Sequence, residues 1–170
     1  MNVKVSNHLF YCFVALIGIL LTYWFKTAQD DVWELLLYPH ARAVEIFYNT
    51  PMNYVNGIGY YSIDAVFAIG RECMGYNFIV MMFGMNACMF AKYFKGLHKI
   101  SWLFISFVGA ILIGILISCI RIVGSVPFVT HEKFTLIHSG VGIAFYFFAL
   151  ASTYAIIKNL VGRKNLEDNC

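Results

Sequence analysis

The chain has 170 residues, of which 61% are hydrophobic and only 12% are charged, and its formal net charge is +3. A soluble domain carries about a quarter charged residues. This composition therefore excludes an ordinary soluble domain and predicts a protein embedded in a lipid bilayer. The basic residues stand in scattered clusters, which argues against a nucleic-acid-binding surface.

Four long apolar runs predict an all-α polytopic membrane protein. The expected helices cover residues 8–25, 75–94, 100–120 and 134–157. Helices of roughly 18 to 22 residues match a hydrocarbon core of about 30 Å, and a helix satisfies its own backbone in lipid. The first run ends in aromatic residues rather than the small ones that a signal peptidase requires, so it predicts an uncleaved signal anchor.

These helices predict a single membrane domain over residues 1–160, followed by a tail at residues 161–170. Residues 26–72 form a less regular segment. Within it, apolar residues recur at helical spacing over residues 33–48, interrupted by Pro39, and predict an amphipathic helix at the membrane interface. The aromatic and β-branched stretch that follows predicts a short hairpin with its turn near residues 62–64.

The distribution of lysine and arginine predicts the orientation of the helices. These residues gather in the loop after the second helix and in the C-terminal tail: Lys92, Lys95, Lys99, Lys158, Arg163 and Lys164. The positive-inside rule places this loop and both termini in the cytoplasm. Residues 26–72 and 121–133 are then expected to face outward.

Three ionisable residues lie near the outward ends of three different helices. Cys73 precedes the second helix, Arg121 closes the third, and His138 lies about one turn inside the fourth. Ionisable groups beside long apolar runs are costly and are usually functional. A thiol nucleophile, an imidazole base and a guanidinium that stabilises negative charge are the groups that acyl transfer needs. The pattern predicts a site for nucleophilic acyl transfer by a cysteine, without a metal or other cofactor.

Three sparse motifs resemble the exosortase/archaeosortase family, and in particular its short forms such as the exosortase K group. They are Glu72-Cys73-Met74-Gly75 opening one helix, Arg121 ending the next, and His138 with Gly142 after it. Family members usually show a Cys-Ser-Gly-like motif and an asparagine three residues before the arginine. Met74 and Ser118 stand at those two positions here. The resemblance covers about two-thirds of the chain.

The resemblance implies a multi-pass protein of the bacterial cytoplasmic membrane with Cys73, Arg121 and His138 as an outward-facing catalytic site. It implies that the substrates are exported proteins with a C-terminal sorting signal, made of a short motif, a transmembrane helix and a basic end. Cleavage through a thioester on Cys73 would end in hydrolysis or in transfer to an acceptor amine.

Five residues near the three motifs are expected to support the site: Glu72, Gly75, Asn77, Ser118 and Gly142. Gly75 allows a close backbone approach beside the nucleophile, and Asn77 is expected to orient a partner. Two other interpretations remain open. One is a non-enzymatic scaffold or carrier subunit whose polar residues tie helices together. The other is a thiol redox protein that uses Cys73 and Cys119.

Overall fold

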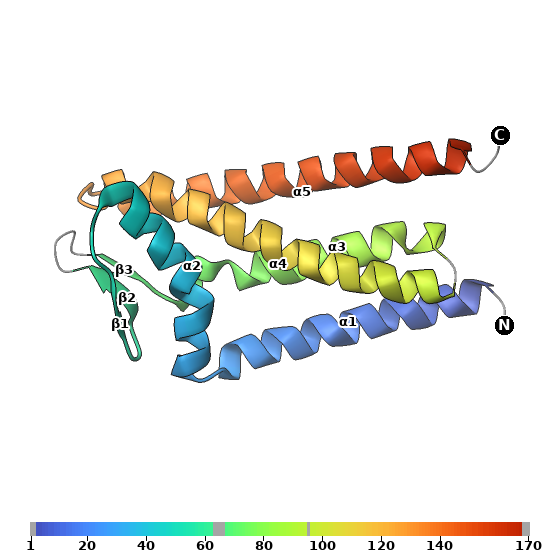
Figure 1. Cartoon of the computed structure of the whole chain (residues 1–170), viewed down its shortest axis with the longest axis horizontal. Helices are drawn as coiled ribbons and strands as arrows, with labels where there is room; N and C mark the ends of the chain where they lie inside the picture. The colour runs from blue at the N-terminus through green and yellow to red at the C-terminus, as the bar shows by residue number, and fades with distance from the viewer. Residues whose placement is uncertain (1–2, 63–66, 95, 168–170) are drawn as a thin grey trace.

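The computed structural model of the chain describes residues 3–62, 67–94 and 96–167 (Figure 1). Four of its helices lie lengthwise in a bundle. Both termini lie at one end, and a fifth helix and a small sheet cover the other, which we call the sheet end. Within the described residues the helices are α1 (Val3–Thr27), α2 (Asp30–Tyr48), α3 (Tyr76–Phe90), α4 (Leu97–Ser125) and α5 (Phe134–Glu167).

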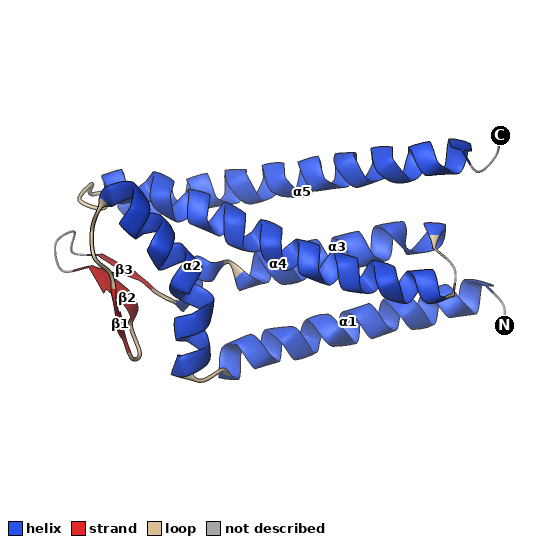
Figure 2. Cartoon of the chain, viewed as in Figure 1, coloured by secondary structure: helices blue, strands red, loops and turns tan. Residues whose placement is uncertain are grey.

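Four helical segments of the described chain are long and apolar enough to cross a membrane: Asn7–Thr27, Arg71–Tyr93, Leu97–Phe128 and Phe134–Val161. Large apolar side chains remain exposed along them, which suits contact with lipid rather than water. The strands are confined to the sheet end (Figure 2). The chain is thus an all-α polytopic membrane protein with a small sheet, as the apolar runs predicted.

Helix α3 lies at the centre of the bundle and packs against α1, α4 and α5. Its closest neighbour is α4, because Gly114 leaves room for the side chain of Ile79. A Cβ atom at position 114 would lie only 2.3 Å from Ile79 Cγ1. This close approach fixes how far α4 is shifted along α3. It therefore also sets the depth of Ser118 and Arg121, which follow Gly114 by one and two helical turns.

Helices α4 and α5 extend past the C-terminal ends expected from their apolar runs. Helix α4 was expected to end at residue 120 but continues to Ser125, so Arg121 lies inside the helix. Pro127 is the first residue after Arg121 that lacks a backbone N–H donor, and α4 ends two residues before it. Helix α5 continues to Glu167 through most of the expected tail, because that stretch contains no proline and mostly good helix formers. Residues 168–170 lie outside the described chain.

The predicted second helix, residues 75–94, is divided into α3 and a 3-10 helix, η2 (Ala91–Tyr93). Another 3-10 helix, η1 (Arg71–Met74), precedes α3. The break between η1 and α3 falls at Gly75, whose φ of 67° and ψ of 34° are left-handed. Cys73 therefore lies in a separate turn at the sheet end and not in the spanning α-helix.

The segment after α2 forms a three-stranded antiparallel sheet: β1 (Asn53–Val55), β2 (Gly59–Ser62) and β3 (Phe67–Ile69), in that order. Strands β2 and β3 pair as the predicted hairpin, with Ser62 opposite Phe67. Most of the turn expected near residues 62–64 lies outside the described chain. The prediction missed β1, which pairs with β2 through a turn at residues 56–58 that contains Gly57 at a φ of 79°.

Helix α2 runs unbroken through Pro39 and buries one face on the bundle. Polar contacts fasten the sheet to it. The Tyr54 hydroxyl donates to the Asp30 carbonyl oxygen at 2.9 Å, and Arg71 forms a salt bridge with the Asp30 carboxylate. Residues 71 and 73 belong to the same 3-10 turn, so these contacts also hold the segment that carries Cys73.

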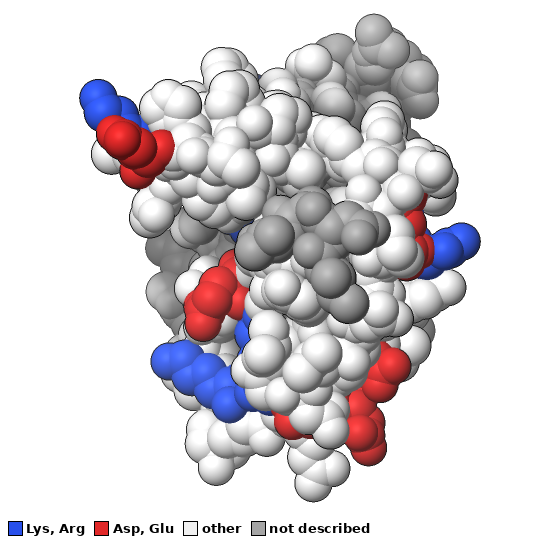
Figure 3. Space-filling view, turned by 90° about the vertical axis from the view of Figure 1, so that its left-hand side faces the viewer, with Lys and Arg blue, Asp and Glu red and all other residues white. Residues whose placement is uncertain are grey.

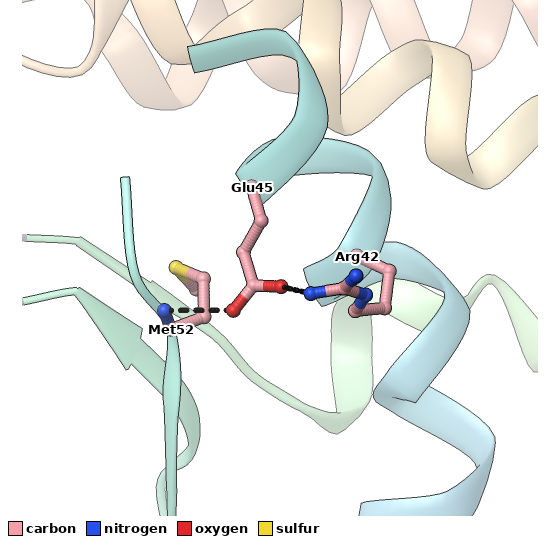
Figure 4. Close-up of polar contacts among 3 residues, drawn as sticks. All are labelled: Arg42, Glu45 and Met52. Carbon is pink, nitrogen blue, oxygen red and sulfur yellow. Dashed lines mark hydrogen bonds and ion pairs between the residues drawn. The ribbon is translucent and has the colours of Figure 1, made fainter. Parts of the chain in front are cut away.

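The other end of α2 is fastened to the chain that enters the sheet (Figure 4). The Glu45 carboxylate lies between two donors. One oxygen accepts the Met52 backbone N–H at 3.1 Å, and the other pairs with the Arg42 guanidinium. Helix α2 and the sheet therefore form one cap over the sheet end.

Candidate functional site

Cys73 lies in η1 at the sheet end and is half-buried. Its backbone N–H donates to the Gly70 carbonyl oxygen at 3.0 Å, which closes the turn. Gly75 then reverses the chain into α3 in a very tight space. A Cβ atom on Gly75 would lie 2.2 Å from the Tyr146 hydroxyl oxygen and 2.8 Å from Ser118 Oγ. The close approach expected at Gly75 is therefore present, and its neighbours come from α4 and α5.

Arg121 reaches from α4 to the main chain of Cys73. Its Nη2 donates to the Cys73 carbonyl oxygen at 2.9 Å, and its guanidinium carbon lies 5.2 Å from the centre of the Tyr146 ring. A cation over an aromatic face is stabilised by the ring quadrupole. Gly142 leaves space for this side chain, because a Cβ atom there would lie 2.9 Å from Arg121 Cδ. Arg121 is only 8% exposed.

Ser118 ties the same elements together one turn before Arg121. Its hydroxyl donates to the Met74 carbonyl oxygen at 2.8 Å and lies 3.4 Å from the Tyr146 hydroxyl oxygen. Helix α4 thus makes two consecutive hydrogen bonds to the main chain of η1. These bonds fix the turn that presents Cys73.

His138 lies in the second turn of α5, and its ring is held by α4. Its Nδ1 lies 3.0 Å from Ser125 Oγ, and the Ser125 hydroxyl in turn donates to the Ile122 carbonyl oxygen at 3.0 Å. Because the Ser125 hydrogen is directed at Ile122, the serine oxygen is the acceptor for His138. This favours the neutral tautomer with the proton on Nδ1, and it leaves Nε2 able to accept a proton.

Cys73 and His138 line one cavity of about 490 Å³ at the sheet end. Such a volume lies within the range of small-ligand pockets. Strand β3, the turn η1, the end of α4 and the start of α5 form its walls, and Glu72 and Ser125 are among its polar residues. Arg121 is not among the lining residues. It lies behind Cys73, where its charge acts on both Cys73 and His138.

The supporting residues differ in how the structure places them. Gly75, Ser118 and Gly142 make the contacts described above, and Glu72 lines the cavity with an exposed side chain. Asn77 is exposed on α3, and no described hydrogen bond links it to the cluster. The two residues that follow it, Phe78 and Ile79, are buried in the core, so position 77 lies on another side of the helix.

The other cysteines of the described chain do not line the cavity. Cys12, Cys73, Cys88 and Cys119 are all free thiols, and Cys119 is not one of the cavity residues. Within the described residues, no group of three or more His, Cys, Asp or Glu side chains is arranged to hold a metal ion.

Three residues of the site were not predicted. Ser125 follows Arg121 by one helical turn, and Tyr146 follows Gly142 by one turn, so helical spacing from the predicted residues would have pointed to both. The third is His40 of α2, which is completely buried and lies within the electrostatic range of Arg121. Its position among apolar residues of an amphipathic helix was a signal that the sequence offered.

Comparison of the chain with models of known protein families, with characterised proteins and with solved structures gives no match. The functional conclusion therefore rests on the geometry of the cluster.

The burial of His40 predicts that the protein loses stability in mild acid. Burial lowers the pKa of His40 from its ordinary 6.5 to about 4; the nearby Leu36 carbonyl opposes this shift, and the Arg121 charge adds to it. Between these two values the unfolded chain binds a proton that the folded chain does not. The contribution of neutral His40 to the free energy of unfolding is therefore fully present above pH 6.5. It is lost as the pH drops towards 4, which lowers the free energy of unfolding by up to about 3 kcal/mol.

Thermal unfolding in detergent between pH 4 and pH 7.5 measures this effect. The His40→Phe variant should lose most of the pH dependence in that range, whereas replacement of the exposed His98 by phenylalanine should leave it unchanged. A wild-type slope that persists in His40→Phe would show that another group binds the proton.

Proposed function

We propose that the chain is a membrane-embedded cysteine peptidase or transpeptidase of the exosortase type. Its substrates are exported proteins with a C-terminal sorting signal. The observation that carries the proposal is that Cys73 and His138 line one cavity while Arg121 holds the main chain of Cys73 from behind. Cys73, His138 and Arg121 come from three different segments, which the fold brings together at the sheet end.

In the first half of the reaction, His138 Nε2 takes the proton of the Cys73 thiol. The resulting thiolate attacks the carbonyl carbon of the scissile peptide bond, and a carbon–sulfur bond forms. The carbon–nitrogen bond then breaks, and His138 returns the proton to the departing amine. The products are a free amine on the membrane anchor and a thioester on Cys73.

In the second half, water or an acceptor amine attacks the thioester carbonyl carbon. His138 takes a proton from this nucleophile and passes it to the departing Cys73 sulfur, which restores the thiol. Water gives hydrolysis, and an amine gives transpeptidation. Ser125 keeps the His138 ring in the tautomer that both halves require.

Arg121 has two roles in this mechanism. Its charge stabilises the negative charge on the Cys73 sulfur, because the buried surroundings screen the interaction weakly. Its hydrogen bond to the Cys73 carbonyl oxygen fixes the turn that presents the thiol. Since Arg121 does not line the cavity, we assign it to the thiolate rather than to the oxyanion of the substrate.

We further propose that the sheet end faces outward from a bacterial cytoplasmic membrane, with both termini in the cytoplasm. Both termini lie at the end opposite the cavity (Figure 1). Lys92 and Lys99 lie near helix ends on that side, and Lys158 lies in the C-terminal part of α5. Charged side chains of both signs are scattered over the sheet end (Figure 3). A site at this depth suits a scissile bond just outside the transmembrane helix of a substrate.

One observation favours a non-enzymatic scaffold instead. Ser118 and Arg121 both donate to main-chain oxygens of η1, so the cluster also ties α4 to the sheet end. A scaffold needs these hydrogen bonds but does not need the Cys73 thiol. Replacing that thiol therefore separates the two functions.

The test is the processing of a co-expressed substrate that ends in a sorting signal, in cells with matched membrane levels of wild type, Cys73→Ala and Cys119→Ala. Loss of cleavage only in Cys73→Ala is the expected result. A hydroxylamine-sensitive adduct of substrate and enzyme should form on wild type and be absent from Cys73→Ala.

Cleavage at the wild-type rate by Cys73→Ala would remove the nucleophile and favour the scaffold. Loss of activity in both cysteine variants, but not in a Cys88→Ala control, would favour a redox protein that uses Cys73 and Cys119.

A further inference from the structure

His40 lies in the cap, where α2 crosses the bundle. It is 0% exposed, and α2 packs against both α4 and η1. Two turns after His40, the Tyr48 hydroxyl donates to the Val123 carbonyl oxygen at 2.6 Å. Helix α2 is therefore held against the part of α4 that carries Arg121.

His40 and Arg121 share an unusual property. Neither ring nitrogen of His40 has a hydrogen-bond partner among the described residues, and neither does Nε of Arg121. A buried polar atom without a partner is rare and costly. Here the unpaired atoms lie on two neighbouring elements, and the two side chains interact electrostatically.

The unpaired atoms are chemically complementary. A neutral imidazole has one N–H donor and one bare nitrogen that accepts, whereas Arg121 Nε–H can only donate. The carbonyl oxygens of Leu36 and Leu37 lie near the His40 ring without completing a hydrogen bond, and they attract its N–H group. The other ring nitrogen is then a bare acceptor on the helix that packs against α4, where Arg121 has an unused donor.

We propose that His40 is a positioning residue for Arg121. Its bare ring nitrogen accepts the Arg121 Nε–H through one bridging water, while Nη2 holds the Cys73 carbonyl oxygen. Contacts to two different nitrogens fix the plane of the guanidinium, which a single hydrogen bond does not. The effect of this pair on catalysis rests on the proposed function, but the pair itself does not.

A neutral partner suits this cation better than a carboxylate. Arg121 forms no salt bridge in the described part of the chain, so its full positive charge remains available to the thiolate. An aspartate at position 40 would hold the guanidinium equally well but would cancel much of that charge. Histidine holds Arg121 in place without reducing the positive charge that acts on the Cys73 thiolate.

Two measurements test the pair. The first is thermal unfolding at pH 7.5 of wild type, His40→Phe, Arg121→Met and the double variant, which needs no substrate. The His40→Phe substitution removes the acceptor. It should change the unfolding midpoint by at least about 3 °C in the wild-type background and by clearly less in the Arg121→Met background. Equal shifts in the two backgrounds would overturn the pairing.

The second measurement is the processing rate of the same co-expressed substrate. His40→Phe should lower the rate about 100-fold at matched membrane levels. His40→Gln, which keeps an acceptor, should recover most of it, and the exposed control His98→Phe should match wild type. A wild-type rate in His40→Phe would overturn the positioning role.

The two measurements also separate this proposal from the proposed function. If wild type processes no substrate, the proposed function fails, and the unfolding cycle still decides whether His40 and Arg121 form a pair. If His40→Phe does not fold, the rate of His40→Gln decides: a rate near that of wild type supports the acceptor role, and a 100-fold loss contradicts it.

Discussion

Replacing Arg121 by methionine should abolish processing, by about a thousandfold or more, without lowering the thermal stability of the protein. Arg121 is a buried cation with no carboxylate partner in the described chain. Burying a charge costs several kcal/mol, and replacing buried charges by apolar side chains of similar volume is often neutral or stabilising. The lost hydrogen bond to the Cys73 carbonyl oxygen costs only about 1 kcal/mol. The activity, by contrast, needs the charge.

Unfolding midpoints and processing rates of wild type, Arg121→Met and Arg121→Lys check this prediction. Lysine keeps the charge but not the forked geometry, so the processing rate of Arg121→Lys should lie between those of wild type and Arg121→Met. A midpoint that falls by many degrees in Arg121→Met would mean that Arg121 mainly ties α4 to η1. The cluster would then be a structural joint, as the scaffold function requires.

Replacing Gly75 by alanine should destabilise the protein by about 4 kcal/mol. The left-handed backbone of Gly75 strains any other residue, and overpacking adds a similar cost. The new methyl group would meet the Tyr146 hydroxyl at 2.2 Å and Ser118 Oγ at 2.8 Å. Because the Tyr146 ring also lies under Arg121, its displacement should lower the processing rate of the molecules that remain folded.

Two variants separate the causes in unfolding experiments. Gly57→Ala has the same left-handed strain but nothing within 4 Å of its new methyl group, so it should cost only about 1 kcal/mol. Combining Gly75→Ala with Tyr146→Phe removes the closest clashing atom and should restore part of the stability. If Gly75→Ala lowers the free energy of unfolding no more than Gly57→Ala does, then Tyr146 and Ser118 do not pack closely around Gly75.

The spanning helices were predictable because each one is a local property of the chain. A charge-free apolar run in lipid must satisfy its own backbone, and a helix is the structure that does so within one segment. The ends of these helices are harder to predict than their existence. The apolar run stops at residue 120 because Arg121 follows it, which predicts a helix end there. A charged side chain does not interrupt the backbone hydrogen bonds, however, and the helix continues to Ser125.

The sequence also identified most of the residues that meet in the cluster. Cys73, Arg121 and His138 were predicted from their positions at helix ends on the same side of the membrane, since helices of similar length bring such ends to a similar depth. Depth alone does not say which side of a helix faces its neighbours. Asn77 was expected to orient a partner, but its side chain is exposed and no described hydrogen bond links it to the cluster.

What the sequence by itself determined is therefore the number of spanning helices and the depth of the ionisable residues, both of which follow from local hydrophobicity and helical rise. Only the tertiary structure decided which side chains meet. Gly114 lets α4 approach Ile79 and so sets its position along α3. Tyr146 reaches Arg121 from a helix that is distant in sequence, and His40 is buried on the helix that packs against α4. Both positions depend on rotations of α5 and α2 that only the packing of the whole bundle fixes.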